Sequence, residues 1–276
     1  MAQGLLQGKK GIIFGALDEN SIAWRVALEA HRQGATFTLT NAPVALRLGT
    51  IQRLAEATQA KLIPADATVV EDLERLIQES QESLGGKIDF VLHSIGMSPN
   101  VRKGRPYTDL NYEWLIKTLD ISAISLHKLL QVCYKADALN EWGSVVALTY
   151  IAAQRTFPSY GDMAEAKALL ESVVRSFGYY YGIHRKVRIN SVSQSPTKTT
   201  AGTGIKGFDT FYGFADKMSP LGNADADECA AFCVALFSDL CRKVTMQNIY
   251  HDGGFSSMGV SEPIMNIFSA NPEGTK

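Results

Sequence analysis

The sequence has few cysteines, and they form no pattern typical of a metal or redox site. Only four occur, at Cys133, Cys229, Cys233 and Cys241. They include no CxxC pair, and no histidine lies at the spacing of a zinc site. We therefore expect reduced, buried thiols without a structural disulfide, as in proteins of a reducing compartment such as the cytoplasm.

An excess of charge and a long apolar run are also missing. Lysine and arginine number 27 against 28 aspartates and glutamates, which leaves a formal net charge of −1. This balance provides no electrostatic attraction to nucleic acid or anionic lipid. The longest apolar run, residues 229–237, is too short for a bilayer, which takes about 20 residues. The first residues lack a secretory apolar core, so we expect no secretory leader.

What the sequence does contain is a regular alternation of strand and helix patterns over its 276 residues. We expect strands at residues 10–14, 36–40, 61–63, 88–93, 144–148, 187–190 and 248–250. We expect one helix that begins near Ile22 and ends at Gly34, and others over about 47–58, 70–84, 111–134 and 160–177. This alternation predicts a single-domain α/β fold of the Rossmann type, a doubly wound parallel sheet with helices on both faces.

Two segments interrupt the alternation. Residues 194–221 are rich in glycine, threonine and serine, and an irregular stretch of this length is often a functional lid. Residues 256–276 contain several glycines and prolines, and we expect a partly ordered tail without an assigned role. The predicted organisation is one dinucleotide-binding domain over residues 1–255, which includes the lid-like segment 194–221, followed by that tail.

The turn after the first predicted strand has features of a phosphate-binding loop. Gly15 permits a tight turn and a close approach of the backbone to a pyrophosphate. Ser21 and Ile22 open the next helix, whose first N–H groups attract phosphate. The turn lacks the GxGxxG pattern, so an ordinary helix N-terminus explains it equally well when it is considered alone.

Two further strand ends are expected at the same edge of the sheet, where such folds bind their ligands. Asp66, beside Ala67, can accept a hydrogen bond from an adenine amine, although a turn-forming aspartate is an equal alternative. Gly96, after Ser94 and Ile95, lets the backbone pass close to a ribose.

The end of the second predicted strand bears on the choice of nicotinamide cofactor. Asn41 lies where many NAD enzymes place an acidic residue that binds the ribose hydroxyls. Arg47 lies nearby and could reach a 2′-phosphate, but a solvated surface arginine is the favoured interpretation. The residues alone therefore leave NADH and NADPH both open.

Two tyrosines and a lysine follow the fifth predicted strand. Tyr150 lies at its end, Tyr160 comes ten residues later, and Lys167 a further seven. Seven residues make nearly two helical turns, so Tyr160 and Lys167 would share one helix face to within about 20°. The ammonium would lower the pKa of the phenol and offer donors to ribose hydroxyls. The phenol could then donate to an oxyanion that develops on a substrate.

Each of these three residues has a simpler interpretation when it is taken singly. Tyr150 fits a buried strand aromatic, Tyr160 a residue at a helix start, and Lys167 a solvated helix surface. Together, after a strand end in a dinucleotide-type fold, they indicate a nicotinamide-dependent site. Lys167 is also flanked by alanines on an expected inner face, where a buried lysine needs a partner or a function.

With these residues in place, the sequence resembles the short-chain dehydrogenase/reductase superfamily. Within it, the sequence is similar to the NADH-dependent enoyl-[acyl-carrier-protein] reductases of bacterial type II fatty-acid synthesis, over nearly the whole chain up to Phe255. Ordinary members of the superfamily place lysine four residues after the catalytic tyrosine, a position held here by Ala164. Tyr150 replaces their usual serine. The resemblance also covers residues 21–23, 31–35, 93–96, 120–122, 148–150, 187–190, 204–208 and 251–255.

The resemblance implies roles for individual residues. Tyr160 would hydrogen-bond the thioester carbonyl and stabilise an enolate, Lys167 would hold the nicotinamide ribose, and Tyr150 would shape the substrate pocket. Met163 and Phe208 would border the acyl chain. NAD would contact Gly15, Ser21, Ile22, Asn41, Asp66, Ala67, Ser94, Ile95, Gly96, Lys167, Thr197 and Thr199. The implied activity is NADH-dependent reduction of the double bond of trans-2-enoyl-[acyl-carrier-protein] thioesters. The implied partners are the acyl-carrier protein and further copies of the chain in a homotetramer.

The sequence departs from the family at residues 140–142 and at two places near the expected site. Residues 194–196 read Gln-Ser-Pro where the family usually has Ala-Gly-Pro, and Ala42 falls where the family has a glutamine near the adenine ribose. The resemblance implies NADH as the preferred cofactor, and the alanine at position 42 leaves NADPH open. A keto or aldehyde reductase on the same scaffold and a non-catalytic NAD(P)-binding sensor are the alternative functions.

Overall fold

The protein is built on a parallel sheet of seven strands, seen in a computed structural model that describes residues 4–47, 50–205 and 207–270. The strand order is β3-β2-β1-β4-β5-β6-β7, and every neighbouring pair is parallel. The strands are β1 Lys10–Phe14, β2 Thr36–Thr40, β3 Lys61–Leu62, β4 Ile88–His93, β5 Leu139–Thr149, β6 Arg188–Gln194 and β7 Asn248–His251. The predicted α/β doubly wound fold is confirmed, and its order reverses between β1 and β4.

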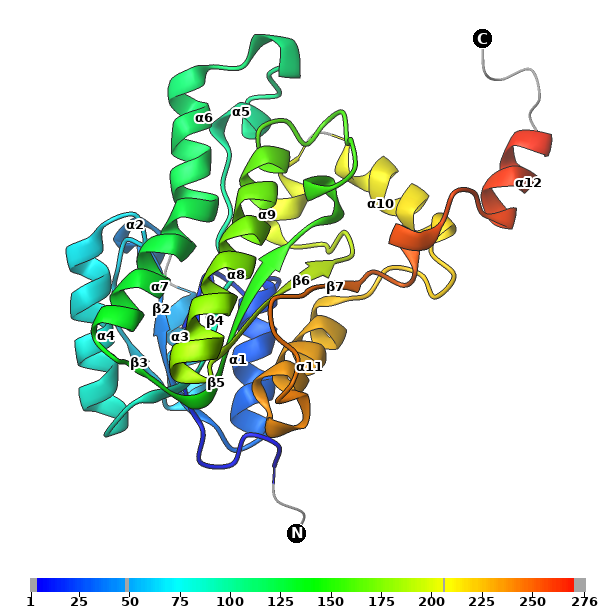
Figure 1. The fold of residues 1–276 in the computed structure, drawn as a ribbon. Helices are drawn as coiled ribbons and strands as arrows, with labels where there is room; N and C mark the ends of the chain where they lie inside the picture. The colour runs from blue at the N-terminus through cyan, green and yellow to red at the C-terminus, as the bar shows by residue number, and fades with distance from the viewer. Residues whose placement is uncertain (1–3, 48–49, 206, 271–276) are drawn as a thin grey trace.

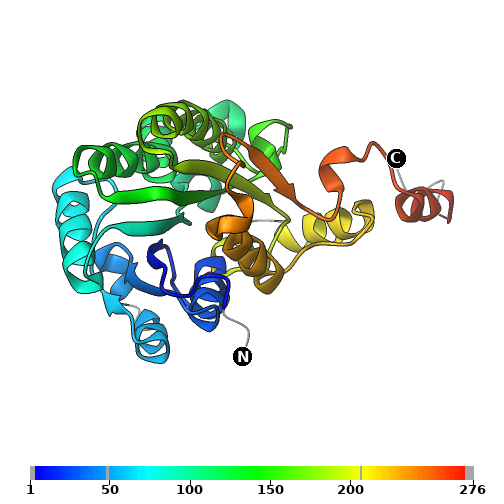
Figure 2. The ribbon, with the colours of Figure 1, turned by 60° about the horizontal axis from the view of Figure 1, so that its bottom comes forward.

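Helices cover both faces of the sheet (Figures 1 and 2). One face carries α1 (Ile22–Arg32), α3 (Ile51–Thr58) and α11 (Ala226–Phe237), whose buried side chains form one apolar cluster with the strands. The other carries α4 (Val70–Leu84), α7 (Ser125–Lys135) and α8 (Met163–Arg185), which form the second cluster. The central strands are thus apolar on both faces, as their sequences predict.

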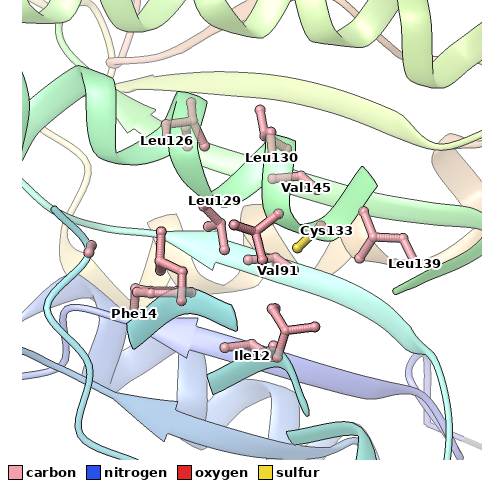
Figure 3. Close-up of a cluster of buried hydrophobic side chains, with 14 of the residues drawn as sticks. Ile12, Phe14, Val91, Leu126, Leu129, Leu130, Cys133, Leu139 and Val145 are labelled. Carbon is pink, nitrogen blue, oxygen red and sulfur yellow. The ribbon is translucent and has the colours of Figure 1, made fainter. Parts of the chain in front are cut away.

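The cluster beneath α7 shows how the alternation of strand side chains builds the core (Figure 3). Ile12 and Phe14 of β1 point toward α7, whereas Ile13 between them packs on the opposite face. Leu126 and Leu129 of α7 lie against them, spaced as one side of a helix. Each such fully buried side chain contributes about 1.5–3 kcal/mol.

Two strands are longer than predicted. β5 begins at Leu139 rather than at residue 144, and β6 continues to Gln194. The start of β5 is polar and irregular, because Trp142 has φ +65° and the pairing register with β4 shifts between Ile88 and Phe90. An apolar strand pattern cannot reveal such a segment.

Several helix boundaries also differ from the prediction. The helix predicted over 47–58 is α3, which begins only at Ile51; a separate short helix, α2 (Pro43–Leu46), precedes the predicted range, and residues 48–49 lie outside the described part. The helix predicted over 111–134 is α6 (Tyr112–Leu119) and α7, joined by the π-helical η2 (Asp120–Ile124). The helix predicted from residue 160 starts at 163 and continues to 185.

The lid-like segment is more regular than expected. It contains α9 (Thr200–Thr203) and α10 (Phe208–Met218), with Lys206 outside the described residues. The glycines, threonines and serines of this segment predicted no helix at α10. The helix begins directly after Gly207, whose φ is +79°. The remaining short helices are α5 Pro99–Arg102, η1 Tyr107–Asp109, η3 Ile151–Ala153, η4 Asp239–Cys241 and η5 Phe255–Ser257.

The segment predicted as a tail contains a helix, α12 (Glu262–Ala270), which extends away from the sheet (Figure 1). The Ser261 hydroxyl, directly before α12, donates to the Lys217 carbonyl of α10 at 2.7 Å. Residues 271–276 lie outside the described part. The tail is therefore attached to the lid-like segment rather than to the sheet.

Two further features concern the helices and the cysteines. Among residues 4–47, 50–205 and 207–270, no helix is both long and apolar enough to cross a membrane. All four cysteines are unpaired, and Cys133, Cys229 and Cys233 are buried among apolar side chains.

Candidate active site

A cavity of about 1060 Å³ opens at the carboxyl ends of the parallel strands. Segments that follow β1, β2, β4, β5 and β6 contribute to its wall, as expected where a doubly wound sheet reverses its strand order. Every residue assigned to the site from the sequence lines it: Gly15, Ser21, Ile22, Asn41, Asp66, Ala67, Ser94, Ile95, Gly96, Tyr150, Tyr160, Met163, Lys167, Thr197, Thr199 and Phe208. The structure brings all of them together, and their individual roles stay a prediction.

The turn after β1 has a backbone conformation and a close contact that only glycine permits. Gly15 has φ +90°, and a Cβ at this position would lie 1.9 Å from the Ser94 carbonyl oxygen. The side chain of Ser21 faces the turn rather than the helix, because its Oγ donates to the Asp18 carbonyl at 2.7 Å and accepts from Leu17 N at 3.2 Å. The N-terminus of α1 therefore points at the cavity without a side-chain cap.

The loops after β2 and β3 are braced by their own polar side chains. Asn41 Nδ2 donates to the Ala16 carbonyl at 2.9 Å, so this amide ties the β2 end to the glycine turn. Asp66 Oδ1 accepts from both the backbone N and the hydroxyl of Thr68, at 2.9 and 2.7 Å. Its second carboxyl oxygen makes no hydrogen bond within the described residues and can accept one from a ligand.

Lys167 is a buried cation in the cavity wall. Its Nζ donates to the Leu148 carbonyl at 2.8 Å, and the residue is 7% exposed. Burial lowers the pKa of Lys167 to about 8, and the charge of Glu171 opposes that shift. Burial, with a smaller contribution from Lys167, lowers the pKa of His93 to about 3, so His93 is a neutral imidazole beside the ammonium.

Glu171 is a functional candidate that the sequence reasoning missed. It lies one helical turn after Lys167 and is 3% exposed. Its carboxylate accepts from the Thr149 hydroxyl at 3.0 Å and from Gln154 Nε2 at 2.9 Å, and the Tyr250 hydroxyl donates to Gln154 Oε1 at 2.6 Å. The sequence could have revealed Glu171, because an acidic residue four positions after a lysine lies beside that lysine on the same face of a helix.

The prediction that Tyr160 and Lys167 share one face of a single helix is wrong. Tyr160 lies in the turn before α8, which begins at Met163, and Gly161 interrupts the helical path with φ +49°. Tyr160 nevertheless lines the same cavity as Lys167. The tight turn before α8, rather than two turns of one helix, therefore brings the Tyr160 phenol into the cavity that Lys167 lines.

The expected lowering of the phenol pKa is also wrong. Burial raises the pKa of Tyr160, so the side chain is a neutral hydroxyl. Burial likewise raises the pKa of Tyr150, with smaller contributions from Tyr160 and Asp252. The two rings lie 5.1 Å apart at 50°. Within the described residues the buried Tyr150 hydroxyl has no hydrogen-bond partner, which leaves it available to a ligand.

Aromatic side chains that the sequence did not single out complete the wall near the tyrosines. Phe157 lies 5.4 Å from the Tyr150 ring and 5.2 Å from that of Phe211. Phe211 is on α10, three residues after Phe208, and both line the cavity. The spacing of three residues between these two phenylalanines is typical of a helix, but the glycine- and threonine-rich composition of the segment predicted an irregular stretch.

The segment after β6 contributes a further part of the cavity wall. Thr199 caps α9 by accepting from Gly202 N at 2.9 Å, and the Thr197 hydroxyl donates to the Ser195 carbonyl at 3.0 Å. The Thr200 hydroxyl donates to Asp18 Oδ2 at 2.5 Å. This contact joins the lid-like segment to the glycine turn across the cofactor end of the cavity.

Known proteins share both the sequence and the fold of this chain. Residues 15–256 match the family described as Enoyl-(Acyl carrier protein) reductase. The chain is 32% identical over 254 residues to Enoyl-[acyl-carrier-protein] reductase [NADH] 2 of Rhizobium meliloti, which covers 92% of this chain and 93% of that protein. It is 34% identical over 263 residues to the FabI reductase of Rickettsia felis, covering 94% and 98%.

Solved structures agree with these relatives. The crystal structure of the FabI–NADH complex from Alistipes finegoldii is 65% identical, with a TM-score of 0.93 over 94% of this chain and 92% of that one. The crystal structure of Enoyl-[acyl-carrier-protein] reductase (NADH) from Aquifex aeolicus is 32% identical, with a TM-score of 0.86 over 93% and 100%. Because family and relatives match over most of its length, the chain belongs to the enoyl-[acyl-carrier-protein] reductase family.

Proposed function

We propose that the protein reduces the carbon–carbon double bond of trans-2-enoyl-[acyl-carrier-protein] thioesters with NADH, as a step of fatty-acid elongation. Its relatives are named as NADH-dependent enoyl-[acyl-carrier-protein] reductases, and one related structure holds NADH. The observation that carries the proposal is the placement of Tyr150, Tyr160 and Lys167 around one cavity whose other end is a glycine-formed cradle.

The described residues fit a nicotinamide dinucleotide. A Cβ on Gly96 would lie 3.3 Å from Met163 Cε and 3.5 Å from Lys167 Nζ, so a larger residue would fill the space beside the ammonium. We assign the pyrophosphate to the α1 N-terminus with Gly15, the adenine amine to Asp66, and the nicotinamide ribose to Lys167. When bound, NADH supplies the hydride that the β-carbon of the substrate receives.

Tyr160 is assigned to the substrate carbonyl. Negative charge develops on the thioester oxygen as the β-carbon is reduced, and a neutral phenol can donate a hydrogen bond to it without first losing a proton. The raised pKa of Tyr160 suits this role, because burial keeps the hydroxyl protonated. The α-carbon then takes a proton to complete the saturated thioester.

The aromatic wall is assigned to the acyl chain. Met163, Phe157, Phe208 and Phe211 border the part of the cavity next to the tyrosines. These apolar side chains keep water from the reacting group, which strengthens the hydrogen bond from Tyr160 in a medium of low dielectric. Tyr150 packs on Tyr160 and lines the same cavity, and its hydroxyl has no hydrogen-bond partner among the described residues.

A direct assay distinguishes this function from its alternatives. NADH oxidation is followed with a crotonyl thioester and, separately, with an acetoacetyl thioester, and both runs are repeated with NADPH. We expect turnover of the crotonyl substrate with NADH. Turnover of acetoacetyl thioester alone would identify a keto reductase, and NADH binding without turnover of either substrate would identify a dinucleotide sensor.

Assembly and location are proposed more broadly. We propose the acyl-carrier protein as the macromolecular partner, and a homotetramer as the assembly. Exposed apolar side chains support an interface: Tyr112, Ile116, Tyr179, Tyr180 and Ile183. Light scattering should then give about four times the chain mass of 30.1 kDa. Four unpaired cysteines support a reducing compartment, and we propose the cytoplasm.

The domain boundaries are proposed as follows. Residues 1–255 form one reductase domain that includes the substrate-binding segment 194–221, and residues 256–276 form a tail. The continuous seven-stranded sheet supports the single domain, and the contact of Ser261 with α10 supports a tail that packs on the substrate-binding segment. Truncation after residue 255 should leave the sheet folded, which circular dichroism can measure.

A further inference from the structure

A buried carboxylate lies beside the proposed catalytic tyrosine. Asp162 is 0% exposed and sits two residues after Tyr160, in the turn that leads into α8. Its Oδ1 accepts from the Ser98 hydroxyl at 2.5 Å, and its Oδ2 accepts from Asn100 Nδ2 at 2.8 Å and from the Thr118 hydroxyl at 2.9 Å. No lysine, arginine or histidine in the described residues lies within ion-pair distance of it. A carboxylate removed from water in this way needs such donors.

The carboxylate is turned away from its own helix. Asp162 occupies the position directly before α8, where an aspartate usually accepts from the first N–H groups of a helix. Its side chain makes no such bond, and its backbone is helical at φ −69° and ψ −6°. Both oxygens instead face residues that are 44 to 64 positions earlier in the chain. Helix capping therefore does not explain this buried acid.

The donors belong to two different elements. Ser98 caps α5, because its hydroxyl also accepts from Val101 N at 3.0 Å. Asn100 uses its second N–H on the Asn111 carbonyl at 3.1 Å and accepts from Asn111 N at 3.0 Å. Thr118 is on α6. One carboxylate thus joins α5, the residue before α6, and α6 itself to the turn that carries Tyr160.

The turn that carries Tyr160 is held by backbone hydrogen bonds and by packing against α5. Tyr160 N donates to the Phe157 carbonyl at 3.0 Å, and Met163 N donates to the Tyr160 carbonyl at 3.2 Å, so the backbone on both sides of Tyr160 is held. Gly161 packs against α5: a Cβ there would lie 3.2 Å from Val101 Cγ2. A shift of the carboxylate would therefore move the phenol with it.

We propose that Asp162 is a positioning residue for Tyr160, holding the phenol at the thioester carbonyl through its bonds to Ser98, Asn100 and Thr118. Asp162 does not line the cavity, so it acts through the tyrosine rather than on the substrate. The inference rests on the proposed role of Tyr160. It predicts that disturbing the carboxylate lowers turnover while NADH, held at the other end of the cavity, still binds.

A double-mutant cycle tests the proposal on the full chain with a crotonyl thioester and NADH. Asp162→Asn retains the shape but presents an N–H to one of the donors, so at least one hydrogen bond is lost. We expect kcat to fall about tenfold to a hundredfold, as small displacements of a catalytic group do, with NADH Kd changed less than twofold. In the Tyr160→Phe background, the same substitution should change kcat less than twofold.

An equal loss of kcat in both backgrounds would overturn the proposal, as would weaker NADH binding that accounts for the loss. Thr118→Val, which removes one donor and keeps the carboxylate, provides a second test if Asp162→Asn fails to fold. It should show the same dependence on Tyr160, and no effect on kcat would contradict us. Ser80→Ala is the matched control, because it removes a buried hydroxyl that bonds Thr38 at 2.8 Å, remote from the cavity. If Tyr160→Phe alone leaves kcat unchanged, the proposed function of Tyr160 fails instead.

Discussion

The two ends of the cavity are built in different ways. At the cofactor end (the turns at Gly15, Asp66 and Gly96), the wall is formed by turns that follow parallel strands. At the substrate end (Tyr150, Tyr160 and the phenylalanines around them), the side chains come from the end of β5, from the segment before α8 and from α10. The first end depends on topology, whereas the second depends on contacts between segments far apart in sequence.

This difference predicts that binding and turnover can be separated. Lys167 is anchored to β5 through Leu148, while Tyr160 is anchored to α5 and α6 through Asp162. A change at one anchor should leave the other in place. Substitutions can therefore be chosen to impair NADH affinity or the reduction step, and the comparison fails if both always change together.

The largest effect is expected for Tyr160→Phe. Loss of one hydrogen bond to a developing oxyanion typically costs about 2.7–4 kcal/mol, so kcat should fall about a hundredfold to a thousandfold. NADH Kd should stay the same, because the phenol is assigned to the substrate. Tyr179→Phe is the control: this tyrosine is on α8, the helix that follows the Tyr160 turn, and it is 52% exposed. Steady-state kinetics with a crotonyl thioester, and fluorescence titration of NADH, give both quantities.

The next largest effect is expected for Lys167→Ala. Hydrogen bonds from a charged donor contribute about 1.5–3 kcal/mol, so NADH should bind about tenfold to a hundredfold more weakly. At saturating NADH, kcat should fall less than in Tyr160→Phe. Unchanged NADH affinity in this variant would remove Lys167 from the cofactor end.

Glu171→Gln should shift the pH at which NADH affinity weakens. Because the pKa of Lys167 is about 8, the ammonium is present below that pH and is lost above it, so NADH affinity should weaken as pH rises through about 8. Glu171 favours the charged lysine; without its charge, the inflection should shift to lower pH. The other titratable neighbours, His93 and Tyr160, are neutral across this range.

The measurement is NADH Kd on both sides of the inflection. Glu74→Gln on α4, an exposed carboxylate away from the cavity, is the control and should leave the profile unchanged. An inflection that stays in place in Glu171→Gln would show that the carboxylate does not act on Lys167.

The smallest effect is expected for Tyr150→Phe. Its hydroxyl is buried without a partner in the described residues, so its removal should leave Tm unchanged or raise it slightly. If the substrate satisfies this hydroxyl, one neutral hydrogen bond of about 0.5–1.5 kcal/mol is lost, and KM should rise about twofold to tenfold. A loss of kcat as large as that of Tyr160→Phe would mean that the two tyrosines share one role.

The cofactor end could be read from sequence because its signals are local. Gly15, Asp66 and Gly96 each follow an apolar strand, and parallel topology alone brings strand ends together. The substrate-binding segment was harder to predict, since its glycines and threonines concealed α10 and hence the helical pair Phe208 and Phe211.

The details around the tyrosine could not be predicted, for two physical reasons. A seven-residue spacing suggests a helix, but the positive φ of Gly161 replaces the first helical turn with a tighter one. The donors to Asp162 lie 44 to 64 residues away, so no periodicity or spacing marks them. The pKa of Tyr160 likewise depends on burial, which the residue types alone do not reveal.

The central claim, hydride addition to the β-carbon of an enoyl thioester, is tested most directly by isotope transfer. NADH carrying deuterium at both positions of nicotinamide C4 is oxidised by the enzyme with crotonyl thioester in ordinary water, and the product is examined by NMR. We predict one deuterium at C3 of the butyryl product and none at C2. Deuterium at C2, or a product in which the double bond remains, would contradict the account.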